Sequence, residues 1–208
     1  MVQKIREAVL AGNMTDAATL TTQALSAGID PATILNDGLI SAMDVVGSEF
    51  ESGIRFIPEM LISAEAMKAA MRVLRPQLVA SGVASKGKVV IGTVEGDLHD
   101  IGKDLVCTML EGAGFDTIDL GVEVTADRFV AAVREHSPDV VAMSALLTTT
   151  MVFMPKVIEA LVEAGLRDSV KIVVGGAPVT AEYASKIGAD GFAGDAAGAV
   201  VLAKKLFV

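Results

Sequence analysis

The chain has 208 residues, 52% of them hydrophobic, and a formal net charge of −9. These values are typical of a globular protein with one large or two small domains, and they exclude a disordered chain. Because affinity for phosphate depends on clustered Lys and Arg, and Lys204-Lys205 is the only adjacent basic pair, we expect no nucleic-acid partner. The single cysteine, Cys107, excludes an internal disulfide. No run is long and apolar enough to span a membrane, so we expect a cytoplasmic protein without a membrane partner.

Residues 1–85 show only helical periodicity, with apolar side chains three and four positions apart. Gly28 is a typical helix end, and Asp30-Pro31 supplies a favoured cap followed by a residue tolerated in the first turn. The pattern predicts helices over Val2–Ala11, Met14–Ala27, Pro31–Phe50 and from Pro58 onward. Four helices with short connections predict a four-helix bundle.

The small, polar segment Ser81–Gly87 predicts a linker and hinge between this bundle and a second domain, residues 88–208. There, short β-branched runs alternate with helical patterns. Strands are predicted at Lys88–Val94, Asp116–Leu120, Asp139–Leu146, Lys171–Val174 and Gly191–Ala193. Helices are predicted at Ile101–Ala113, Thr125–His136, Met151–Ala164, Thr180–Ile187 and Asp195–Phe207. This alternation predicts a Rossmann-like (flavodoxin-like) five-stranded parallel sheet with helices on both faces, which binds ligands at the carboxyl ends of its strands.

The loop after the first predicted strand is Gly96-Asp97-Leu98-His99-Asp100-Ile101-Gly102, and it contains one of the two histidines of the chain. A carboxylate two residues before the histidine can hold one ring nitrogen and make the other a better metal ligand. Glycines on both sides permit the close approach of a large group. A lone histidine in such a loop is more often solvated or capping a helix, and the other histidine, His136, is expected at the surface.

The composition of this loop excludes several other sites. A structural zinc site needs further His or Cys ligands at short spacing, and none accompanies His99. The glycines do not give the G-x-G-x-x-G pattern of dinucleotide sites, and Gly102-Lys103-Asp104 is not a P-loop. If His99 binds a metal, that metal must bring most of its own ligands, as it does in a haem or a corrin ring.

Together with two later segments, this loop resembles the signature D-x-H-x-x-G … S-x-L … G-G of the cobalamin-binding domain family. The three parts follow the first, third and fourth predicted strands, at Asp97 to Gly102, Ser144-Ala145-Leu146 and Gly175-Gly176. The helical half is similar to the cap module of methionine synthases and of small corrinoid methyltransferase proteins. The resemblance covers nearly the whole chain, so residues 1–85 are expected to be a helical cap domain and residues 88–208 a cobalamin-binding domain.

The resemblance implies a role for each matching residue. His99 would be the lower ligand of cobalt in place of the cofactor's own dimethylbenzimidazole, and Asp97 would hold the His99 ring, so both would take part in catalysis. Thr150 stands where methionine synthases extend this pair with a serine. Further contacts with the cofactor and its nucleotide tail would come from Gly96, Leu98, Asp100, Gly102, Ser144, Leu146, Thr148, Gly175, Gly176 and Ala196. Without the family context, the glycines are typical of a strand-to-helix turn, Ser144 of a strand end and the threonines of a helix cap.

The resemblance also implies a function. The chain would be a corrinoid protein that carries a methyl group on the cobalt of cobalamin, or of a related corrinoid, in the base-off, His-on state. The methyl group would pass from a substrate-specific methyltransferase to a second methyltransferase, whose acceptor is tetrahydrofolate or coenzyme M. A reductive activation protein would be a further partner. Related small proteins serve methanol, methylamine, betaine or methoxy-aromatic substrates, and this chain does not itself specify which.

Other interpretations stay open at this stage. The same histidine motif occurs in the small subunits of adenosylcobalamin mutases, although the helical cap argues against one. A cobalamin-sensing regulator would need a DNA-binding segment, and the acidic N-terminal half offers no basic recognition helix. A flavodoxin-like domain that binds no cobalamin is a further alternative, and absence of corrinoid binding would favour it. Phe50, Phe56, Met60 and Met67 could cover the upper face of the corrin ring, but a helical stripe of this kind is more often plain core.

Overall fold

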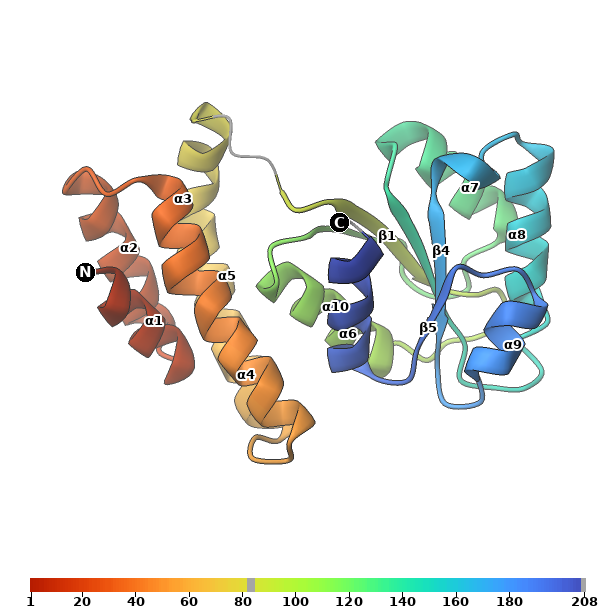
Figure 1. Cartoon of the computed structure of the whole chain (residues 1–208), viewed down its shortest axis with the longest axis horizontal. Helices are drawn as coiled ribbons and strands as arrows, with labels where there is room; N and C mark the ends of the chain where they lie inside the picture. Colours follow the sequence, from red (N-terminus) through yellow and green to blue (C-terminus); the bar gives the residue numbers. More distant parts are fainter. Residues whose placement is uncertain (82–84, 207–208) are drawn as a thin grey trace. The chain divides into compact units, whose positions relative to one another are not determined.

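The computed structural model describes residues 1–81 and 85–206 (Figure 1). The chain divides into two compact units, Met1–Ser85 with Glu111–Gly114, and Lys86–Leu110 with Phe115–Val208. Three residues in the middle of the predicted linker, Gly82, Val83 and Ala84, lie outside the described residues, as do Phe207, where the last predicted helix ends, and Val208. Each unit is described by itself below.

The first unit is helical, as predicted. Its elements are α1 (Val2–Leu10), α2 (Met14–Ser26), α3 (Pro31–Thr33), the π-helix η1 (Ile34–Ile40), α4 (Ser41–Glu51) and α5 (Ile57–Ala80). Side-chain caps explain where two of them begin. The side chain of Asn13 accepts the backbone N–H of Asp16, and that of Asp30 accepts the N–H of Thr33. Each cap satisfies a backbone donor that the first helical turn leaves without a partner.

The prediction of one regular helix over Pro31–Phe50 is wrong in its middle, because the seven residues of η1 are π-helical. At Gly38 the chain approaches α1 closely: a Cβ atom there would lie 3.5 Å from a side-chain atom of Val2 and 3.6 Å from one of Ile5. The hydroxyl of Ser41 donates to the carbonyl of Asp37 at 2.6 Å, just where the wider helix ends. The spacing of apolar residues in the sequence does not reveal the close approach to α1. It does not reveal the change from an α-helical to a π-helical repeat either.

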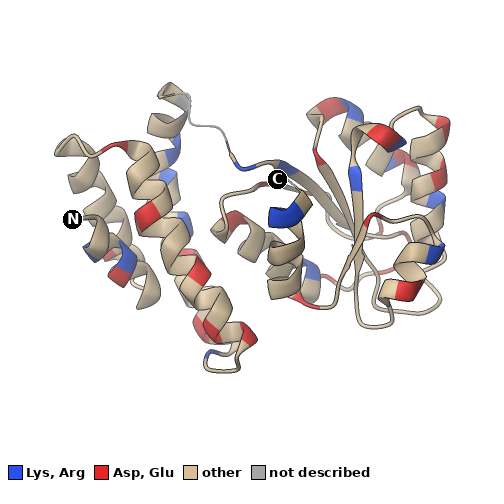
Figure 2. Cartoon of the chain, in the orientation of Figure 1, with Lys and Arg blue, Asp and Glu red and all other residues tan. Residues whose placement is uncertain are grey.

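The charges of α5 are sorted along its axis. Glu59 and Glu65 lie in the first half of the helix and Arg72 and Arg75 in the second half, with Lys68 at the middle. Figure 2 shows acidic and basic residues interspersed along the ribbons of both units. Acidic groups near the start of a helix and basic groups near its end both interact favourably with the helix dipole. The effect is confined to the terminal turns, so it applies here to Glu59 in the first turn, whereas the last turn contains no basic residue.

The second unit is an α/β domain with one five-stranded, fully parallel sheet. The strands are β1 (Lys88–Thr93), β2 (Asp116–Asp119), β3 (Val140–Ser144), β4 (Lys171–Gly175) and β5 (Gly191–Ala193), in the spatial order β2-β1-β3-β4-β5. The helices are α6 (Ile101–Gly112), α7 (Ala126–His136), α8 (Phe153–Glu163), the 3-10 turn η2 (Arg167–Ser169), α9 (Ala181–Lys186) and α10 (Ala196–Leu206). This strand order confirms the predicted flavodoxin-like fold.

Helices cover both faces of the sheet (Figure 1), with α6 and α10 on one side and α7 and α8 on the other. Large side chains between the sheet and α7 and α8 are fully buried, among them Phe129, Met154, Leu161 and Ile172. Full burial of such a side chain contributes roughly 1.5–3 kcal/mol. Among the described residues, no helix is long and apolar enough to cross a membrane.

Four strands end in one row across the sheet. Thr93 of β1 pairs with Ser144 of β3, Ser144 pairs with Gly175 of β4, and Gly175 pairs with Ala193 of β5. Because β2 lies on one side of β1 and β3 on the other, the chain leaves β1 and β3 in opposite directions. That switch point is where doubly wound sheets bind ligands. The row therefore places the loops that follow β1, β3, β4 and β5 at one end of the sheet.

Candidate functional site

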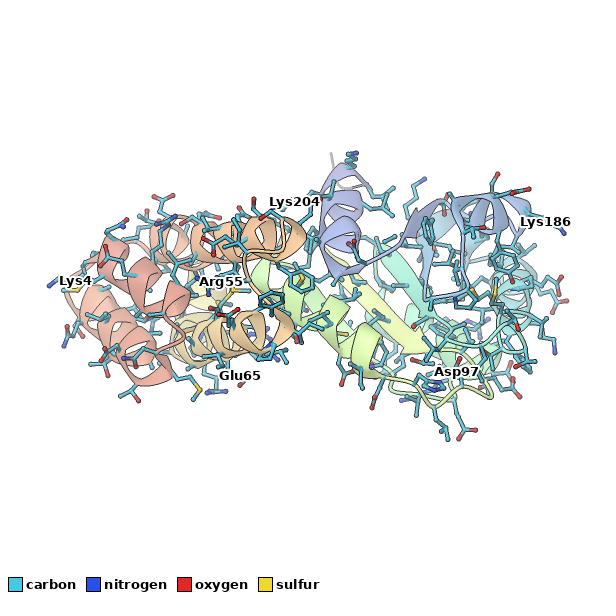
Figure 3. The ribbon with its side chains drawn as sticks, turned by 90° about the horizontal axis from the view of Figure 1, so that it is seen from below. Lys4, Arg55, Glu65, Asp97, Lys186 and Lys204 are labelled. Atoms are coloured by element: carbon cyan, nitrogen blue, oxygen red, sulfur yellow. The ribbon has the colours of Figure 1, made fainter. Side chains whose placement is uncertain are left out.

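The carboxylate of Asp97 is the centre of the candidate site. Its side chain is 0% exposed, in the loop that leaves β1 (Figure 3). Oδ1 accepts the backbone N–H of His99 at 3.1 Å and lies 2.7 Å from His99 Nδ1. Oδ2 accepts the N–H of Leu146 at 2.8 Å, the N–H of Leu147 at 3.4 Å and the hydroxyl of Thr150 at 2.7 Å. One side chain thus joins the loop after β1 to the loop after β3.

These contacts keep Asp97 ionised. Burial by itself would raise the pKa of its carboxyl group, but the hydrogen bonds from Thr150, His99 and Leu146 outweigh burial and hold the pKa well below its usual range. An ionised carboxylate can only accept hydrogen bonds. The proton between the two side chains therefore belongs to Nδ1 of His99.

His99 presents its other ring nitrogen away from Asp97. Its side chain is 51% exposed, whereas the carboxylate that holds it is completely buried. With Nδ1 protonated, Nε2 of the neutral ring carries a lone pair that can bind a metal ion. The buried hydroxyl of Thr93 donates to the carbonyl of His99 at 2.9 Å, so the main chain is held as well as the ring.

The loop after β3 begins earlier than predicted. The sequence pattern predicted a strand to Leu146, but β3 ends at Ser144. The reason is that the N–H groups of Leu146 and Leu147 turn to the carboxylate of Asp97 instead of a neighbouring strand. No side chain caps α8, whose flanking residue is Val152. The hydroxyl of Thr150 lies instead between Asp97 and the carbonyl of Leu147, as a relay from Asp97 would require.

The remaining predicted residues lie around this centre with different exposures. Leu98, Asp100 and Gly102 are exposed beside His99, and Leu146 and Thr148 are exposed in the loop after β3. Ser144 is half-buried at the end of β3. The side chain of Ala196 is buried, which leaves its backbone N–H, in the first turn of α10, as the group that could contact a ligand.

Of the four predicted glycines, Gly96 is exposed with φ +77°, and the other three fall into two groups. A Cβ atom on Gly176, which has φ +122°, would overlap the carbonyl oxygen of Ala145, and one on Gly175 would lie 2.8 Å from the carbonyl oxygen of Ala193. Close packing of the strand ends therefore accounts for both of these glycines without any ligand. By contrast, a Cβ atom on Gly102 would meet no atom within 4 Å. Only a group that is not part of the chain would require glycine there.

Of the four residues predicted to cover a ligand from the helical unit, Met60 and Met67 are buried, so they belong to its core. Phe50 is half-buried and Phe56 is exposed. Exposed apolar side chains gather in the sequence around Phe56, at Ile54, Ile57, Leu61 and Ile62. Phe56 is thus the member of the predicted set that is free to contact another molecule.

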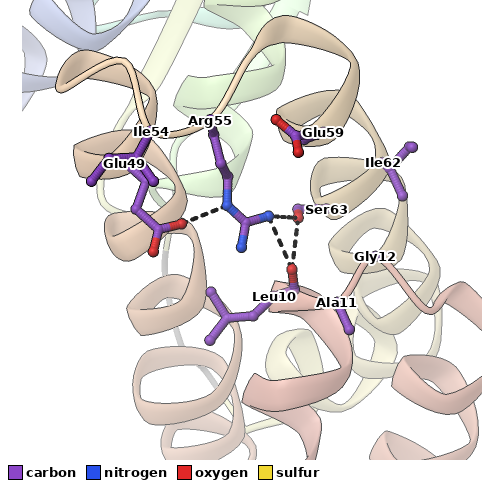
Figure 4. Close-up of a pocket in the computed structure, with 9 residues that line it drawn as sticks. All are labelled: Leu10, Ala11, Gly12, Glu49, Ile54, Arg55, Glu59, Ile62 and Ser63. Carbon is purple, nitrogen blue, oxygen red and sulfur yellow. Dashed lines mark hydrogen bonds and ion pairs between the residues drawn. The ribbon is translucent and has the colours of Figure 1, made fainter.

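A pocket of about 450 Å³ lies in the same unit, between the end of α1, the end of α4 and the start of α5 (Figure 4). Arg55 crosses it: its Nε donates to Glu49 at 2.5 Å, and its Nη1 donates to the carbonyl of Leu10 and to the hydroxyl of Ser63, each at 3.0 Å. These bonds join three helices. We therefore assign the pocket to a structural junction and the candidate site to the loop around His99.

Several residues that shape the site were not predicted. The sequence pattern places Thr93 only within a predicted strand, and it places Lys103 only in a segment that does not match a P-loop. The backbone N–H of Glu123, a residue with φ +52°, donates to the carbonyl of Asp97 at 3.1 Å. The sequence contains only weak indications of these roles. Thr93 is a hydroxyl residue at a strand end, Lys103 lies in a first helical turn, and Glu123 is an acidic residue with a backbone conformation that favours glycine.

Comparison with known proteins agrees with this geometry. A family model described as "B12 binding domain" matches residues 87–203, and a second model with the same description matches residues 1–75. The chain is 46% identical over 192 residues to trimethylamine corrinoid protein 1 of Methanosarcina acetivorans, covering 91% of this chain and 89% of the relative. It is 41% identical over 209 residues to a corrinoid protein of Desulfitobacterium hafniense, covering 99% and 97%.

Solved structures give the same result. The methanol:cobalamin methyltransferase complex MtaBC from Methanosarcina barkeri contains a chain that matches with a TM-score of 0.88 and 32% identity, covering 99% of this chain and 79% of that one. A cobalamin-binding protein from Desulfitobacterium hafniense matches with a TM-score of 0.79 and 31% identity, covering 99% and 98%.

Fold, site and comparisons define a B12-binding protein, and the chain belongs to that family. Within the family it is a small corrinoid protein, similar over nearly its whole length to those of methylamine and methanol systems. Its cofactor is cobalamin or a related corrinoid.

Proposed function

We propose that the chain carries a methyl group on the cobalt of a bound corrinoid, with His99 as the lower ligand of the metal in the base-off, His-on state. The observation that carries this proposal is the orientation of His99, whose Nδ1 faces a buried carboxylate while the ring stays half exposed. The cofactor supplies a cobalt ion that accepts and releases a methyl group. The chain supplies the ligand, the charge that orients it, and the space beside it.

The donor groups of the site fit such a cofactor. Among the described residues, no three His, Cys, Asp or Glu side chains gather into a metal-binding cluster. A single imidazole suits a metal that arrives with four ring nitrogens, and not a bare ion that needs several protein ligands. The open space at Gly102 and the exposed side chains of Leu98 and Leu146 would face the lower side of the ring.

The nucleotide tail of the cofactor is proposed to enter the α/β unit at the row of strand ends. Ser144 and Thr148 would hydrogen-bond it, and the loop after β5, with Ala196, would line its path. Gly175 and Gly176 contribute by keeping the ends of β3, β4 and β5 close together, since their own backbone packing requires glycine. This row lies at the switch point where doubly wound sheets bind ligands.

The names of the relatives support a proposal for the partners. The structural neighbour in the MtaBC complex belongs to a methanol:cobalamin methyltransferase, and other relatives are trimethylamine and dimethylamine corrinoid proteins. We propose that this chain works in the cytoplasm with a substrate-specific methyltransferase, a second methyltransferase acting on tetrahydrofolate or coenzyme M, and a reductive activation protein. The substrate is set by the first of these enzymes.

A methyl-transfer assay tests this function. The chain, loaded with corrinoid, reduced and supplied with methyl iodide, should yield a corrinoid whose bound methyl group is passed to an acceptor by a cognate methyltransferase. His99→Ala should slow this transfer or lower cofactor binding, while His136→Gln should do neither. Retention of adenosylcobalamin in a productive complex with a mutase subunit would favour the alternative of a mutase, and cofactor-dependent binding to DNA would favour a sensor.

A further inference from the structure

Lys103 is a buried charged residue that has no part in the proposed corrinoid site. Its side chain is 1% exposed, in the first turn of α6, four residues after His99. Its Nζ lies 2.5 Å from Oδ1 of Asp104 and 2.5 Å from Oδ2 of Asp119. Burial disfavours a charged lysine, and the positive start of a helix repels it. The two carboxylates must compensate for both effects, so this position is a demanding one for a lysine.

The contacts of Lys103 lead back to His99. Asp119 is the last residue of β2, and its Oδ1 accepts the N–H of Gly121 at 2.9 Å. The carbonyl of Gly121 accepts the N–H of Thr93 at 3.0 Å. Thr93 in turn donates its hydroxyl to the carbonyl of His99 at 2.9 Å. A chain of hydrogen bonds therefore runs from Lys103 through the end of β2 to the main chain of His99.

The segment between the two residues has little other support from its side chains. Those of His99, Asp100 and Ile101 are exposed, and Gly102 has none. Asp97 is buried before this segment, and Lys103 is the first buried side chain after it. The exposed segment is thus fixed at both ends by a buried charge, negative at Asp97 and positive at Lys103.

We propose that Lys103 is a positioning residue for His99, which acts through Asp119, Gly121 and Thr93. Asp97 orients the imidazole ring. Lys103 determines where the helix after His99 begins, and it thereby determines the position of the His99 carbonyl. The consequence for the cofactor rests on the proposed role of His99 as the cobalt ligand. The effect of Lys103 on the orientation of the His99 ring does not depend on that role, and it can be measured in the protein without corrinoid.

Lys103→Met tests the proposal on the full chain, since methionine keeps an apolar stem and removes the charge. Asp104 and Asp119 have side chains 59% and 40% exposed, so water can solvate them after the change and the fold should persist. Asp119→Asn is the matched variant. It leaves an oxygen for the N–H of Gly121 and removes only the ion pair with Lys103. Lys186→Met, on the exposed side of α9 and away from Asp97 in Figure 3, is the control.

Long-range nitrogen-15 NMR of the histidine rings gives the first readout, because the chain has only two histidines and His136→Gln assigns them. In the unchanged protein, His99 should show one set of signals with the proton on Nδ1. Lys103→Met and Asp119→Asn should broaden these signals or shift them toward the other tautomer, and Lys186→Met should not. If both variants are folded and the His99 signals are unchanged, the proposal is wrong. If Lys103→Met does not fold, Asp119→Asn alone decides.

Titration with hydroxocobalamin gives the second readout. Supporting groups around a metal ligand typically change metal affinity by about 10–100-fold, and we expect the lower end, about tenfold weaker binding with a larger fraction of cofactor lacking the histidine ligand. Equal affinity and an equal histidine-bound fraction in Lys103→Met and the unchanged protein would contradict this part. If the unchanged protein binds no corrinoid, the proposed function fails, and the ring signals of His99 still decide the role of Lys103.

Discussion

The carboxylate of Asp97 holds the imidazole of His99 from within one short loop, with Oδ1 at 2.7 Å from Nδ1 and at 3.1 Å from the backbone nitrogen of the same residue. Two contacts to one oxygen fix both the ring and the main chain that carries it. The orientation of His99 is therefore set when the protein folds, before a cofactor arrives. Preorganisation of this kind improves binding because the side chain loses less conformational freedom when it binds a metal.

Asp97→Asn should lower the stability of the cofactor-free protein at pH 7. The amide has one oxygen, so it cannot accept all the donors that now point at the carboxylate from Thr150, Leu146 and His99. We expect a loss of about 1–3 kcal/mol in the free energy of unfolding, measured with urea. Asp100→Asn changes an exposed neighbouring acid and should have a much smaller effect.

The unchanged protein and Asp97→Asn should also differ in how their stability responds to acid. Because the pKa of Asp97 is lowered in the folded state, its ionised form stabilises the fold fully above the ordinary pKa of aspartate, about 3.9. This stability is lost as the pH falls below that value toward the lowered pKa. The difference in unfolding free energy between the unchanged protein and Asp97→Asn should therefore shrink below about pH 4. A difference that stays constant down to pH 3 would argue against a lowered pKa.

Thr150→Val and Thr150→Ser separate the hydroxyl of this residue from its shape. Valine removes the hydrogen bond of 2.7 Å to Asp97, whereas serine keeps it. We expect Thr150→Val to lose about 0.5–1.5 kcal/mol of stability and to bind hydroxocobalamin more weakly, with Thr150→Ser close to the unchanged protein. Thr149→Val, at an exposed neighbour, serves as control. Equal behaviour of the valine and serine variants would rule out a relay through Thr150.

Gly102→Ala should weaken cofactor binding without loss of stability, whereas Gly176→Ala should lower the stability of the protein itself. Alanine at Gly102 meets no atom of the protein and is a better helix former, so stability should be unchanged or slightly higher while cobalamin affinity falls. Alanine at Gly176 would overlap Ala145 and needs a backbone conformation that favours glycine, so the apo protein itself should be destabilised. Thermal unfolding and cofactor titration of both variants measure this. Unchanged affinity in Gly102→Ala would remove that glycine from the site.

The regular parts of the fold could be predicted from the sequence because they follow simple periodicities. Strands β1 to β5 and the helices between them appear within a few residues of their predicted ends, since apolar β-branched runs and capping residues such as Thr125 and Thr180 act locally. The loop with Asp97 and His99 could be singled out because it follows the first strand of a doubly wound pattern and contains a rare residue type.

The rest depends on contacts between distant segments. The contact of Thr150 with Asp97 joins residues 53 positions apart in sequence. The end of β3 at Ser144 depends on the contacts of Leu146 and Leu147 with the same carboxylate, 49 and 50 positions away. The π-helix at η1 adjoins the close approach of Gly38 to α1. The ion pair of Lys103 with Asp119 joins a helix start to a strand end. A single sequence shows the residue types at these places and not their partners, so Met60 and Met67 could equally have been surface or core.

Electron paramagnetic resonance of bound cob(II)alamin tests the central claim most directly, because the nucleus of the lower nitrogen splits the cobalt lines. Natural nitrogen splits each line into three, and nitrogen-15 splits it into two. In protein labelled with nitrogen-15 only in histidine, an imidazole ligand predicts two lines, and His99→Ala should restore three while His136→Gln should leave two. Three lines in the labelled, unchanged protein would show that dimethylbenzimidazole still binds the cobalt, and would contradict the assignment of His99 as its ligand.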